Sequence, residues 1–373
     1  MQIKTYNTGQ LLEFINSEEF KNLENLPISK HRAIAHINNP RALKDDVLLI
    51  CAFNETGALV GYLGLLPDLL HFNSANRRGA WITTIWIHPE TRGKGIANLL
   101  LNAAFNAWHG AIAATGFTAT AKKLYDKYGQ FMDFKMQHGL RVYLRFNLHD
   151  IATVKFPKFG LLPALATLGD HLLNAVNDLR LKLSIANALD KYKIEYLTEL
   201  DSETATFVEK ESRDEIFRRG PEDLNWIMRF PWVLITPGAD ANSKRYFFSH
   251  SDSRFEFIFL KISDKSTGEL VSFIVFEIRG SRMKIPYVYG AENVKADFSG
   301  IISYVMLKRK VAMLTVFNPA VADVIKAGEQ SFLYKKDFSR HYIISKAFED
   351  DLVILSNKTN WKLQDGDSDG AFI

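Results

Sequence analysis

A short basic, glycine-spaced stretch follows a strongly β-prone run: residues 86–101 read WIHPETRGKGIANLLL. The loop from Arg92 to Ala97 has the spacing R-x-x-G-x-A and stands between a predicted strand and a predicted helix. Its glycines and alanine keep side chains away from the backbone, so successive N–H groups can point into one concavity. The helix that begins near Gly95 adds free N–H groups and the positive end of its dipole. The sequence therefore predicts a phosphate or pyrophosphate site, with Arg92 and Lys94 at its rim.

Two other phosphate-binding patterns do not fit this loop. The P-loop pattern G-x-x-x-x-G-K-[ST] does not occur, because nothing with that spacing is followed by Ser or Thr. The dinucleotide pattern G-x-G-x-x-G fails because residue 98 is Asn and no third glycine follows. The loop instead resembles the acetyl-coenzyme A (acetyl-CoA) signature of the GCN5-related N-acetyltransferase (GNAT) superfamily. The resemblance covers roughly residues 45–147, and in that family the motif follows the fourth strand and opens the third helix.

This resemblance implies a binding site made from two neighbouring pieces of chain. The backbone at the end of the fourth strand would pair with the pantetheine arm of acetyl-CoA, and the loop would hold the pyrophosphate. The implied binding residues are Ile85, Trp86 and Ile87 of the strand, with Arg92, Gly93, Lys94, Gly95, Ile96 and Ala97 of the loop. Acetyl-CoA would serve as a co-substrate, and no metal ion is expected.

A second motif bears on the chemistry of the reaction. The sequence AKKLYDKYG at 121–129 resembles the family pattern A-x-x-L-Y-x-x-x-G, which places Tyr125 on the tyrosine that protonates the departing coenzyme A thiolate. A phenol with a pKa near 10 can donate a proton to a thiolate as it forms. The alternative is an aromatic side chain that only fills the groove between helix and sheet. Two departures stand beside the motif: Thr118 replaces a frequent Asn, and Gln130 lengthens the usual Gly-Phe pair.

The general base is not identified by the sequence. An acceptor amine must lose a proton, directly or through water, before it attacks the thioester. Four side chains near predicted strand ends could take it, namely Asp68, His71, His88 and Glu90. Each residue type occurs more often in turns and on surfaces than as a base, so we assign the role to none of them.

The first 150 residues alternate helix and strand patterns. Apolar spacing predicts helices at 10–22, 96–108 and 120–128. Strands are predicted at 47–53 and 58–66, joined by the turn 54–57, and at 79–87, 111–118 and 138–147. We expect an α/β fold with a mixed, largely antiparallel sheet flanked by helices.

The second half repeats this order without repeating its residues. Helical patterns at 170–190 and 203–230 precede predicted strands at 245–249, 254–262, 269–278 and 284–290. A helix at 300–310, a strand at 311–317, a helix at 318–328 and a strand at 340–345 follow. We therefore expect tandem GNAT-like domains, with residues 1–150 binding acetyl-CoA. Residues 151–373 would form a helical linker, with a boundary at 154–169, and a degenerate GNAT-like domain.

The second domain is expected to lack the phosphate loop. After the strand at 284–290 the chain reads AENVKADFSG, which has two acidic residues, one terminal glycine and no R-x-x-G-x-A spacing. Its expected role is to wall the acceptor cleft or to form a homodimer.

Charge and composition exclude several classes of protein. The net charge is +4 and the chain is 47% hydrophobic, which is sufficient for packed cores. The basic clusters at 213–219 and 307–310 fit solvated helix faces better than a nucleic-acid or membrane patch. No apolar run approaches the ~18 residues that span a bilayer. The single cysteine, Cys51, lies in an apolar run and favours a buried core residue in a reducing cytoplasm.

The segment DGDSDG at 365–370 superficially matches the start of a calcium loop. Asp365, Asp367, Asp369 and Gly370 fall at positions 1, 3, 5 and 6. A calcium loop also needs a Glu at position 12 and an entering helix, neither of which the sequence offers. We expect a solvated acidic turn.

Together these patterns predict a cytoplasmic acyltransferase that moves an acetyl group from acetyl-CoA to a small-molecule amine, with no nucleic-acid or membrane partner. The acceptor, an amino sugar or another amine, is not identified. One alternative is a binding module that senses acyl-CoA without turnover. Another is an aminoacyl transferase of the Fem type, a group with a similar duplicated build.

Overall fold

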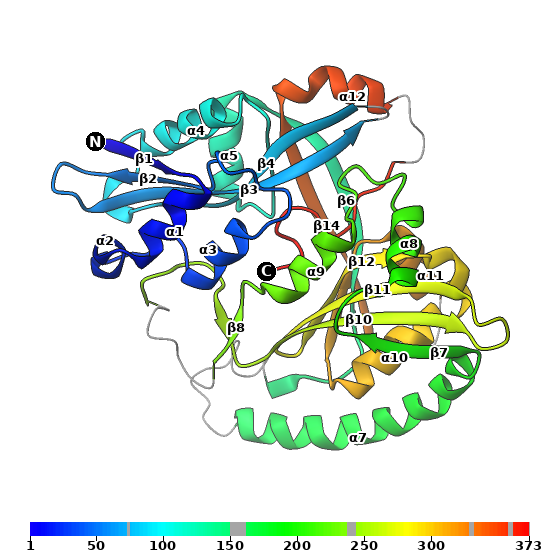
Figure 1. Cartoon of the computed structure of the whole chain (residues 1–373). Coiled ribbons are helices and arrows are strands. Elements are labelled where there is room, and N and C mark those ends of the chain that lie inside the picture. Colours follow the sequence, from blue (N-terminus) through cyan, green and yellow to red (C-terminus); the bar gives the residue numbers. More distant parts are fainter. Residues whose placement is uncertain (73–74, 150–161, 237–243, 328–331, 357–360, 373) are drawn as a thin grey trace. The chain divides into compact units, whose positions relative to one another are not determined.

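The chain folds into two compact units that are interleaved in the sequence. The computed structural model describes all residues except 73–74, 150–161, 237–243, 328–331, 357–360 and 373 (Figure 1). Unit 1 contains Met1–Gln137, Glu199–Ser253 and Arg340–Ile373, and unit 2 contains His138–Thr198 and Arg254–Ser339. This division differs from the consecutive domains 1–150 and 151–373 that we expected. Of the expected linker, residues 154–161 lie outside the described residues, and residues 162–169 begin a long helix.

Unit 1 is built on a mixed sheet with the strand order β1-β2-β3-β4-β5-β14-β6. Strands β1 to β4 pair antiparallel, β4 and β5 pair parallel, and β5 and β14 pair antiparallel. The strands are β1 (Gln2–Tyr6), β2 (Leu49–Phe53), β3 (Leu59–Phe72), β4 (Ala75–Ile87), β5 (Ile112–Thr115), β6 (Phe131–Tyr143) and β14 (Tyr334–Ser345). Strands β6 and β14 each contribute residues to both units.

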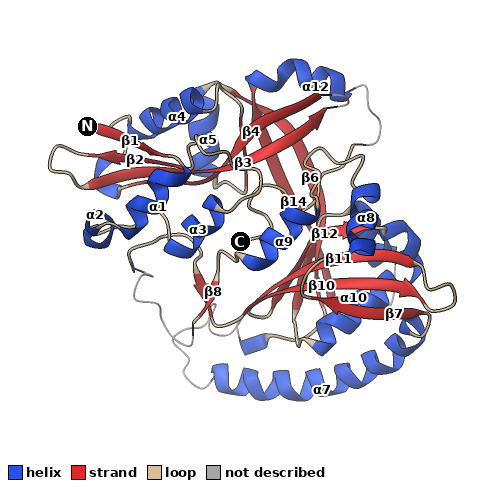
Figure 2. Cartoon of the chain, in the orientation of Figure 1, coloured by secondary structure: helices blue, strands red, loops and turns tan. Residues whose placement is uncertain are grey.

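Helices cover both faces of the unit 1 sheet (Figures 1 and 2). Helix α4 (Ile96–Ala107) and helix α5 (Ala119–Tyr128) pack on one face, with a core that includes Ile82, Leu100 and Tyr125. The other face carries α1 (Thr8–Asn16), α2 (Glu18–Asn22) and α3 (Lys30–Ile37), with Tyr246 and Phe248 from later in the chain packed in the same core. Unit 1 also contains α8 (Ser202–Glu211), α9 (Pro221–Arg229), the short parallel ladder of β8 (Leu234–Ile235) and β9 (Ser251–Asp252), and α12 (Glu349–Ser356).

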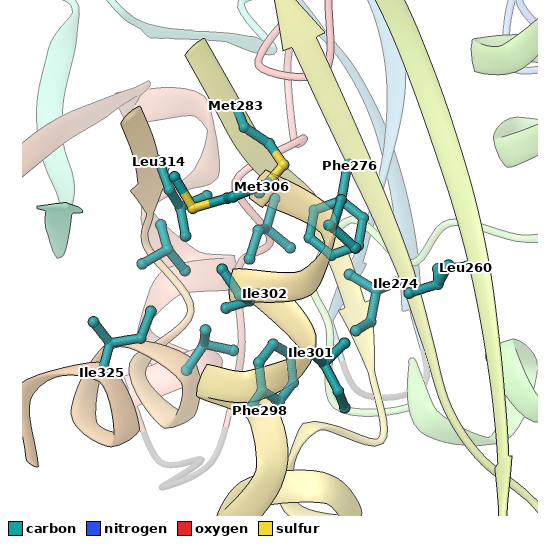
Figure 3. Packing of buried hydrophobic residues seen from close by; sticks show 14 of the residues in the cluster. Leu260, Ile274, Phe276, Met283, Phe298, Ile301, Ile302, Met306, Leu314 and Ile325 are labelled. Carbon is teal, nitrogen blue, oxygen red and sulfur yellow. The ribbon is translucent and has the colours of Figure 1, made fainter. Parts of the chain in front are cut away.

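The strands of unit 2 have the order β7-β10-β11-β12-β13-β6. Its elements are α7 (Leu162–Leu189), β7 (Tyr192–Leu197), β10 (Phe255–Asp264), β11 (Leu270–Arg279), β12 (Arg282–Tyr289), α10 (Phe298–Lys308), β13 (Met313–Val316) and α11 (Pro319–Ala327). Figure 3 shows α10 directing Phe298, Ile302 and Met306 into a core that also contains Ile274 and Leu314 from the sheet. This continuous apolar packing stabilises the unit.

The strands of the two units share one arrangement. In each unit one parallel pair, β4 with β5 and β12 with β13, is joined by a crossover helix, α4 and α10 respectively. The strands on one side of each parallel pair form an antiparallel meander. The protein therefore has the expected α/β class, a mixed sheet flanked by helices.

Most of the predicted elements are present, and three need correction. The predicted helical stretch at 203–230 is interrupted, because α8 ends at Glu211 and α9 begins at Pro221. The predicted helix at 10–22 is split, because the Ser17 side chain accepts a hydrogen bond from the backbone N–H of Phe20 and starts a second helix. The predicted strand at 245–249 is wrong. Its side chains alternate between buried and exposed, as Tyr246 and Phe247 do. No β ladder pairs this segment with another strand within the described chain.

Some elements were not predicted from the sequence. They include β1, α3, β7 and α12, each of which is short or weakly periodic. Cys51 is fully buried in β2, as expected. Among the described helices, none combines the length and the apolar character needed to cross a membrane.

We expect Ile302→Ala to lower the free energy of unfolding by about 2–5 kcal/mol, because Ile302 is fully buried and the truncation leaves a cavity in the unit 2 core. Chemical denaturation followed by circular dichroism measures the loss. The matched control is Leu172→Ala on α7, where the side chain is 65% exposed, and it should change stability by less than about 0.5 kcal/mol. Equal losses in both variants would contradict this account of the core.

Candidate active site

The glycine-spaced loop forms the concavity that its sequence predicts. Gly93 and Gly95 have φ values of +81° and +80°, in the left-handed region that favours glycine. The backbone N–H groups of Gly93, Gly95, Ile96 and Ala97 have no hydrogen-bond partner among the described residues. Helix α4 begins with Gly95 as its N-cap and has no side-chain cap, so its first N–H groups are available to a ligand. The loop therefore offers an anion site with the positive end of a helix dipole behind it.

A pocket of about 550 Å³ lies in front of this loop. All nine binding residues expected from the resemblance line it except Lys94, whose side chain is exposed outside the lining. The other lining residues are Thr91, Asn98, Thr118, Thr120, Ala121, Leu124 and Lys127. The structure thus brings the strand end and the loop together, as the expectation required.

One wall of the pocket is a strand edge without a partner. The parallel ladder between β4 and β5 ends at the pair Ile82 and Ala114, while β4 continues to Ile87. On its other side β4 stays paired with β3 to the same end. The backbone of residues 85–87 therefore lines the pocket along an edge that has no neighbouring strand, where an extended ligand carrying amides can pair as an added strand would. The carbonyl of Ile87 also accepts a hydrogen bond of 3.4 Å from Nε of Arg92.

The pocket is cationic. Its lining contains Arg92 and Lys127 and no Asp or Glu among the described residues. The N-terminus of α5 also reaches the pocket through Thr118, Thr120 and Ala121, so two helix dipoles point their positive ends at it. Lys127 was not predicted, although it stands in the same motif as Tyr125 and follows it by half a turn of helix.

Tyr125 lies in the core behind the pocket. Its side chain is 2% exposed, and its ring contacts those of Phe117 and Phe131 at centroid distances of 5.8 and 5.0 Å. Burial, and to a lesser extent the carboxylate of Asp369, raises the pKa of Tyr125 above its usual value. Among the described residues its hydroxyl forms no hydrogen bond, while the preceding residue, Leu124, lines the pocket. The phenol is therefore protonated at neutral pH and not committed to a structural bond.

The two departures from the family pattern have local structural roles. Thr118 is the N-cap of α5, where its hydroxyl accepts a hydrogen bond of 3.2 Å from the backbone N–H of Ala121. Gly129 ends α5 in a left-handed conformation, and the carbonyl of Gln130 accepts a hydrogen bond from the N–H of Lys346. The extra residue leaves Phe131 in contact with Tyr125.

Among the side chains considered as bases, Asp68 has a structural role. Its carboxylate accepts hydrogen bonds of 3.0 and 2.7 Å from the two terminal nitrogens of Arg219, and one of 2.8 Å from the indole N–H of Trp81. Arg41 forms a further ion pair with it. Burial opposes ionisation, but Arg219 and Arg41 hold the pKa of Asp68 below its usual value. A carboxylate held in this way is a poor proton acceptor.

The expectation of a solvated acidic turn at 365–370 is wrong. Asp365, Asp367 and Asp369 are all buried, because this segment runs through the interior of unit 1 and not over its surface. Asp365 forms an ion pair with Arg340, and Asp367 lies 3.7 Å from the side-chain Nε of Arg219. No group of three or more His, Cys, Asp or Glu side chains in the described chain is arranged to hold a metal ion.

The basic cluster at 213–219 also differs from its expected solvated helix face. These residues do not form a helix, and Arg219 is buried against Asp68. Phe217 is buried with its ring 4.9 Å from that of Trp81. The cluster is a structural part of unit 1.

Comparison with known families now identifies the segment that carries the pocket. Residues 45–129 match the model of the acetyltransferase (GNAT) domain. This segment is a GNAT domain. It contains β2 to β5, the glycine-spaced loop from Arg92 to Ala97, α4 and α5. Both the R-x-x-G-x-A motif and the motif at 121–129 therefore lie within it. A search of curated protein sequences gives no significant match.

Solved structures with a similar fold include several acyltransferases. A GCN5-related N-acetyltransferase from Anabaena variabilis is 12% identical with a TM-score of 0.48, and the alignment covers 92% of this chain and 72% of that one. Saccharomyces cerevisiae N-myristoyltransferase with bound myristoyl-CoA is 13% identical with a TM-score of 0.49, covering 92% and 78%. A tandem GNAT protein from the clavulanic acid biosynthesis pathway is 12% identical with a TM-score of 0.44, covering 92% and 97%. No residue role in this chain follows from these similarities.

The buried acids predict an unusual dependence of stability on pH. Burial, with a contribution from Asp367, raises the pKa of Glu215 to about 8, and burial raises the pKa of Asp367 to about 7. Both pKa values exceed those of the unfolded chain, so between about pH 4 and 8 the folded state binds more protons than the unfolded state. We therefore expect the free energy of unfolding to fall as pH rises through this window, by up to about 1.4 kcal/mol per pH unit for each group.

Urea unfolding at pH 5, 6, 7 and 8 measures this slope. Glu215→Gln keeps an oxygen that can accept the 2.7 Å hydrogen bond from Gln364 but removes the titration, so its slope should be shallower. A wild-type protein that becomes more stable from pH 5 to pH 8, or a variant with an unchanged slope, would contradict the assignment.

Proposed function

We propose that this protein is an N-acyltransferase that moves an acetyl group from acetyl-CoA to a small-molecule amine. The observation that supports this most directly is the pocket in the GNAT domain. There, four unpaired N–H groups of an uncapped helix N-terminus adjoin the unpaired edge of β4. These two features complement the two chemically distinct parts of coenzyme A, a pyrophosphate and an amide-bearing pantetheine arm.

In the proposed complex the pyrophosphate lies on the N–H groups of the loop, with Arg92 and Lys127 supplying positive charge. The pantetheine amides pair with the backbone at Ile85 and Ile87, which brings the thioester toward the point where β4 and β5 separate. The acceptor amine loses a proton and attacks the thioester carbonyl carbon, and the carbon–sulfur bond breaks. The departing thiolate takes a proton from the hydroxyl of Tyr125, whose neutral form burial favours.

Unit 2 is proposed to bind no coenzyme A. The chain that follows β12 forms a short 3-10 helix, Ala291–Asp297, before α10 begins. Its acidic side chains include Glu292 and Asp297, and Asp297 accepts hydrogen bonds from Lys191 and Tyr192. A pyrophosphate site needs hydrogen-bond donors and positive charge at this position, whereas the side chains of Glu292 and Asp297 supply negative charge. The proposed role of unit 2 is therefore structural.

The proposed setting is the cytoplasm, where coenzyme A thioesters are available. The one thiol of the chain is compatible with it, because Cys51 is fully buried and burial raises its pKa well above the usual value. A module that only senses acyl-CoA is the main alternative. The hydroxyl of Tyr125, which the proposal uses as a proton donor, favours the enzyme, because a module that only binds acyl-CoA needs no proton donor.

We expect Gly95→Asp to abolish binding of acetyl-CoA, measured by calorimetric titration, while the circular dichroism spectrum stays unchanged. A Cβ atom at residue 95 meets no other atom within 4 Å, so crowding does not cause the effect. The new carboxylate would lie where the pyrophosphate charge belongs and would repel it. Gly95→Asn is the matched control, because Asn has the same size and a similar tolerance of positive φ but carries no charge. It should lower the affinity much less.

A second control places the same change in unit 2. Gly300→Asp in α10 should leave the affinity for acetyl-CoA unaltered. Equal affinities for the wild type and Gly95→Asp would exclude the proposed site. Binding of acetyl-CoA without release of thiol on any amine would favour the sensor instead.

We expect Tyr125→Phe to lower kcat by ~10²–10⁴-fold, because positioned acid catalysis contributes within that range. The KM for acetyl-CoA should barely move, since the hydroxyl matters mainly as charge develops on sulfur. The melting temperature should also stay near that of the wild type, because the hydroxyl makes no hydrogen bond among the described residues.

The control for this prediction is Tyr128→Phe on the same helix. The hydroxyl of Tyr128 donates a hydrogen bond of 2.9 Å to Asn102, a contact away from the pocket lining. Its loss should leave kcat near normal. A stable Tyr125→Phe variant with near-normal turnover would show that Tyr125 only fills the core.

A further inference from the structure

A buried arginine on α3 forms no ion pair with a described residue. Arg32 is 1% exposed, and its Cζ lies 4.0 Å from the centroid of the Trp232 ring. One terminal nitrogen donates a hydrogen bond of 3.2 Å to the hydroxyl of Tyr246, and the other has no partner in the described chain. No carboxylate of the described residues forms an ion pair with it. An unpaired buried charge is costly, so such a site is suited to an anionic ligand.

Three further polar atoms around Arg32 are buried without a partner. They are Nε1 of Trp232, Nε2 of His36 and the hydroxyl of Tyr62. His36 packs on Trp232 at a centroid distance of 4.8 Å, and Tyr62 belongs to the same apolar cluster as Tyr246. Buried polar groups are almost always hydrogen-bonded, so several unpaired ones in one place indicate a site for a polar ligand.

These atoms include both donors and an acceptor. The indole N–H of Trp232 and the free nitrogen of Arg32 donate hydrogen bonds. Nδ1 of His36 lies 3.1 Å from the carbonyl oxygen of Leu65, so Nδ1 carries the proton and Nε2 accepts. Burial, and the charge of Arg32, lower the pKa of His36 well below its usual value, which keeps the ring neutral. The site can therefore bind a carboxylate and, beside it, a group that donates hydrogen bonds.

A buried carboxylate of opposite charge lies within electrostatic reach of Arg32. Asp369 is 4% exposed, and its carboxylate accepts one side-chain hydrogen bond of 3.3 Å, from Ser368. Burial raises the pKa of Asp369, and Arg32 and Arg340 oppose this rise. No ion pair joins Asp369 to Arg32 or to any other described residue. Arg32 and Asp369 are thus two buried groups of opposite type that lie near each other without forming an ion pair.

We propose that the acceptor amine carries a carboxylate, as a free amino acid does, and that Arg32 binds this carboxylate while Asp369 faces the amino group. This inference rests on the proposed acyl transfer. A zwitterion supplies one negative and one positive charge, which matches one guanidinium and one carboxylate. A phosphate dianion would leave excess negative charge beside Asp369, and a diamine would leave Arg32 unpaired.

The position of these residues is consistent with transfer from the proposed coenzyme A site. Tyr62 stacks on Trp86 at a centroid distance of 5.3 Å, and Trp86 lines the pocket. The charge of Asp369 is also felt by Tyr125. Asp369 takes one proton from the ammonium group of the acceptor, and the amine attacks the thioester carbon. As the carbon–sulfur bond breaks, the thiolate takes the proton of Tyr125, and the second proton lost by the nitrogen restores the Tyr125 hydroxyl.

The segment that carries Asp369 is held against this region by aromatic contacts. Phe372 stacks on Trp232 at a centroid distance of 4.3 Å and also contacts Trp226 on α9. The indole N–H of Trp226 donates a hydrogen bond of 2.8 Å to the carbonyl of Ala35 on α3. In Figure 1 the end of this segment accordingly lies beside α3 and α9. A ligand bound between Arg32 and Asp369 is enclosed, which strengthens its charge interactions.

The first experiment compares acceptors that differ only by a carboxylate. Thiol release from acetyl-CoA is measured with amino acids and with the amines formed by their decarboxylation, such as lysine with cadaverine and tyrosine with tyramine. We expect kcat/KM to be at least about tenfold higher for the amino acid of the pair that reacts. Equal or higher values for the decarboxylated amines would overturn the proposal.

The second experiment removes the anion receptor. Arg32→Met keeps an unbranched apolar stem but loses the charge, and it should lower kcat/KM for the amino acid by about 10–100-fold without changing that for the matched amine. Its melting temperature should not fall below that of the wild type, because an unpaired buried charge is removed. Arg229→Met, at an exposed ion pair with Glu199, is the control and should behave as the wild type. An equal loss on both acceptors would overturn the assignment of Arg32.

Asp369→Asn tests the proton acceptor. We expect turnover of the amino acid to fall at pH 7 and to recover as the pH approaches the pKa of the acceptor amine, because the amine then reaches the site already deprotonated. A loss that does not depend on pH would overturn the role of Asp369.

Direct titration separates this inference from the proposed function. Calorimetry with the amino acid, with and without coenzyme A, should show binding to the wild type and much weaker binding to Arg32→Met. Failure of the protein to bind acetyl-CoA would refute the acyl transfer. Binding of acetyl-CoA with turnover of amines that lack a carboxylate, unaffected by Arg32→Met, would refute only the acceptor class.

Discussion

The buried, ionised side chain of Asp68 connects the separate sequence segments that make up unit 1. A buried carboxylate is tolerated only when every oxygen has a partner, and here the partners come from separate stretches of chain: Trp81 and Arg41 from the first, Arg219 from the second. Arg219 in turn approaches Asp367 in the third stretch. Loss of one member of such a network costs about 3–5 kcal/mol, because it leaves an uncompensated buried charge. This network therefore links all three sequence segments of the unit.

The same network constrains the part of the sheet that carries the pocket. Asp68 lies on β3 and Trp81 on β4, so their hydrogen bond adds to the ladder that joins these two strands. The free edge at the end of β4 faces the pocket because β5 stops pairing with it, while β3 continues to support it. A strand that is rigid on one side and unpaired on the other can present a fixed row of backbone groups to a ligand. The GNAT domain thus depends on residues that lie outside its own segment 45–129.

The two faces of the unit 1 sheet differ in their charge chemistry. On the face of α4 and α5 the pocket is cationic and open to solvent at the loop, which suits a phosphate-bearing ligand. On the other face the charges are buried, and most are paired, as Asp365 is with Arg340 and Asp68 with Arg219. Arg32 and Asp369 form no ion pair with a described residue, although each is buried. Two buried groups of opposite type that lie near each other without pairing are the reason for assigning them to a ligand and not to the fold.

The sequence by itself determined the features that depend on a few consecutive residues. The left-handed turns at Gly93 and Gly95, the uncapped start of α4 and the position of Tyr125 on α5 all follow from local spacing and local backbone preferences. The order of strands and helices could be predicted for the same reason, because hydrophobic periodicity is a local property. Short elements such as β1 and α3 lack enough repeats for such a pattern.

Only the tertiary structure decided which charged residues are buried. A local pattern assigns a basic or acidic run to solvent, and so the clusters at 213–219 and 365–370 were placed on the surface. Arg219 is buried because Asp68, 151 positions earlier, pairs with it, and Asp365 is buried because Arg340 does. The pairing energy that offsets the cost of dehydrating a charge comes from a residue distant in sequence, so no local pattern contains it.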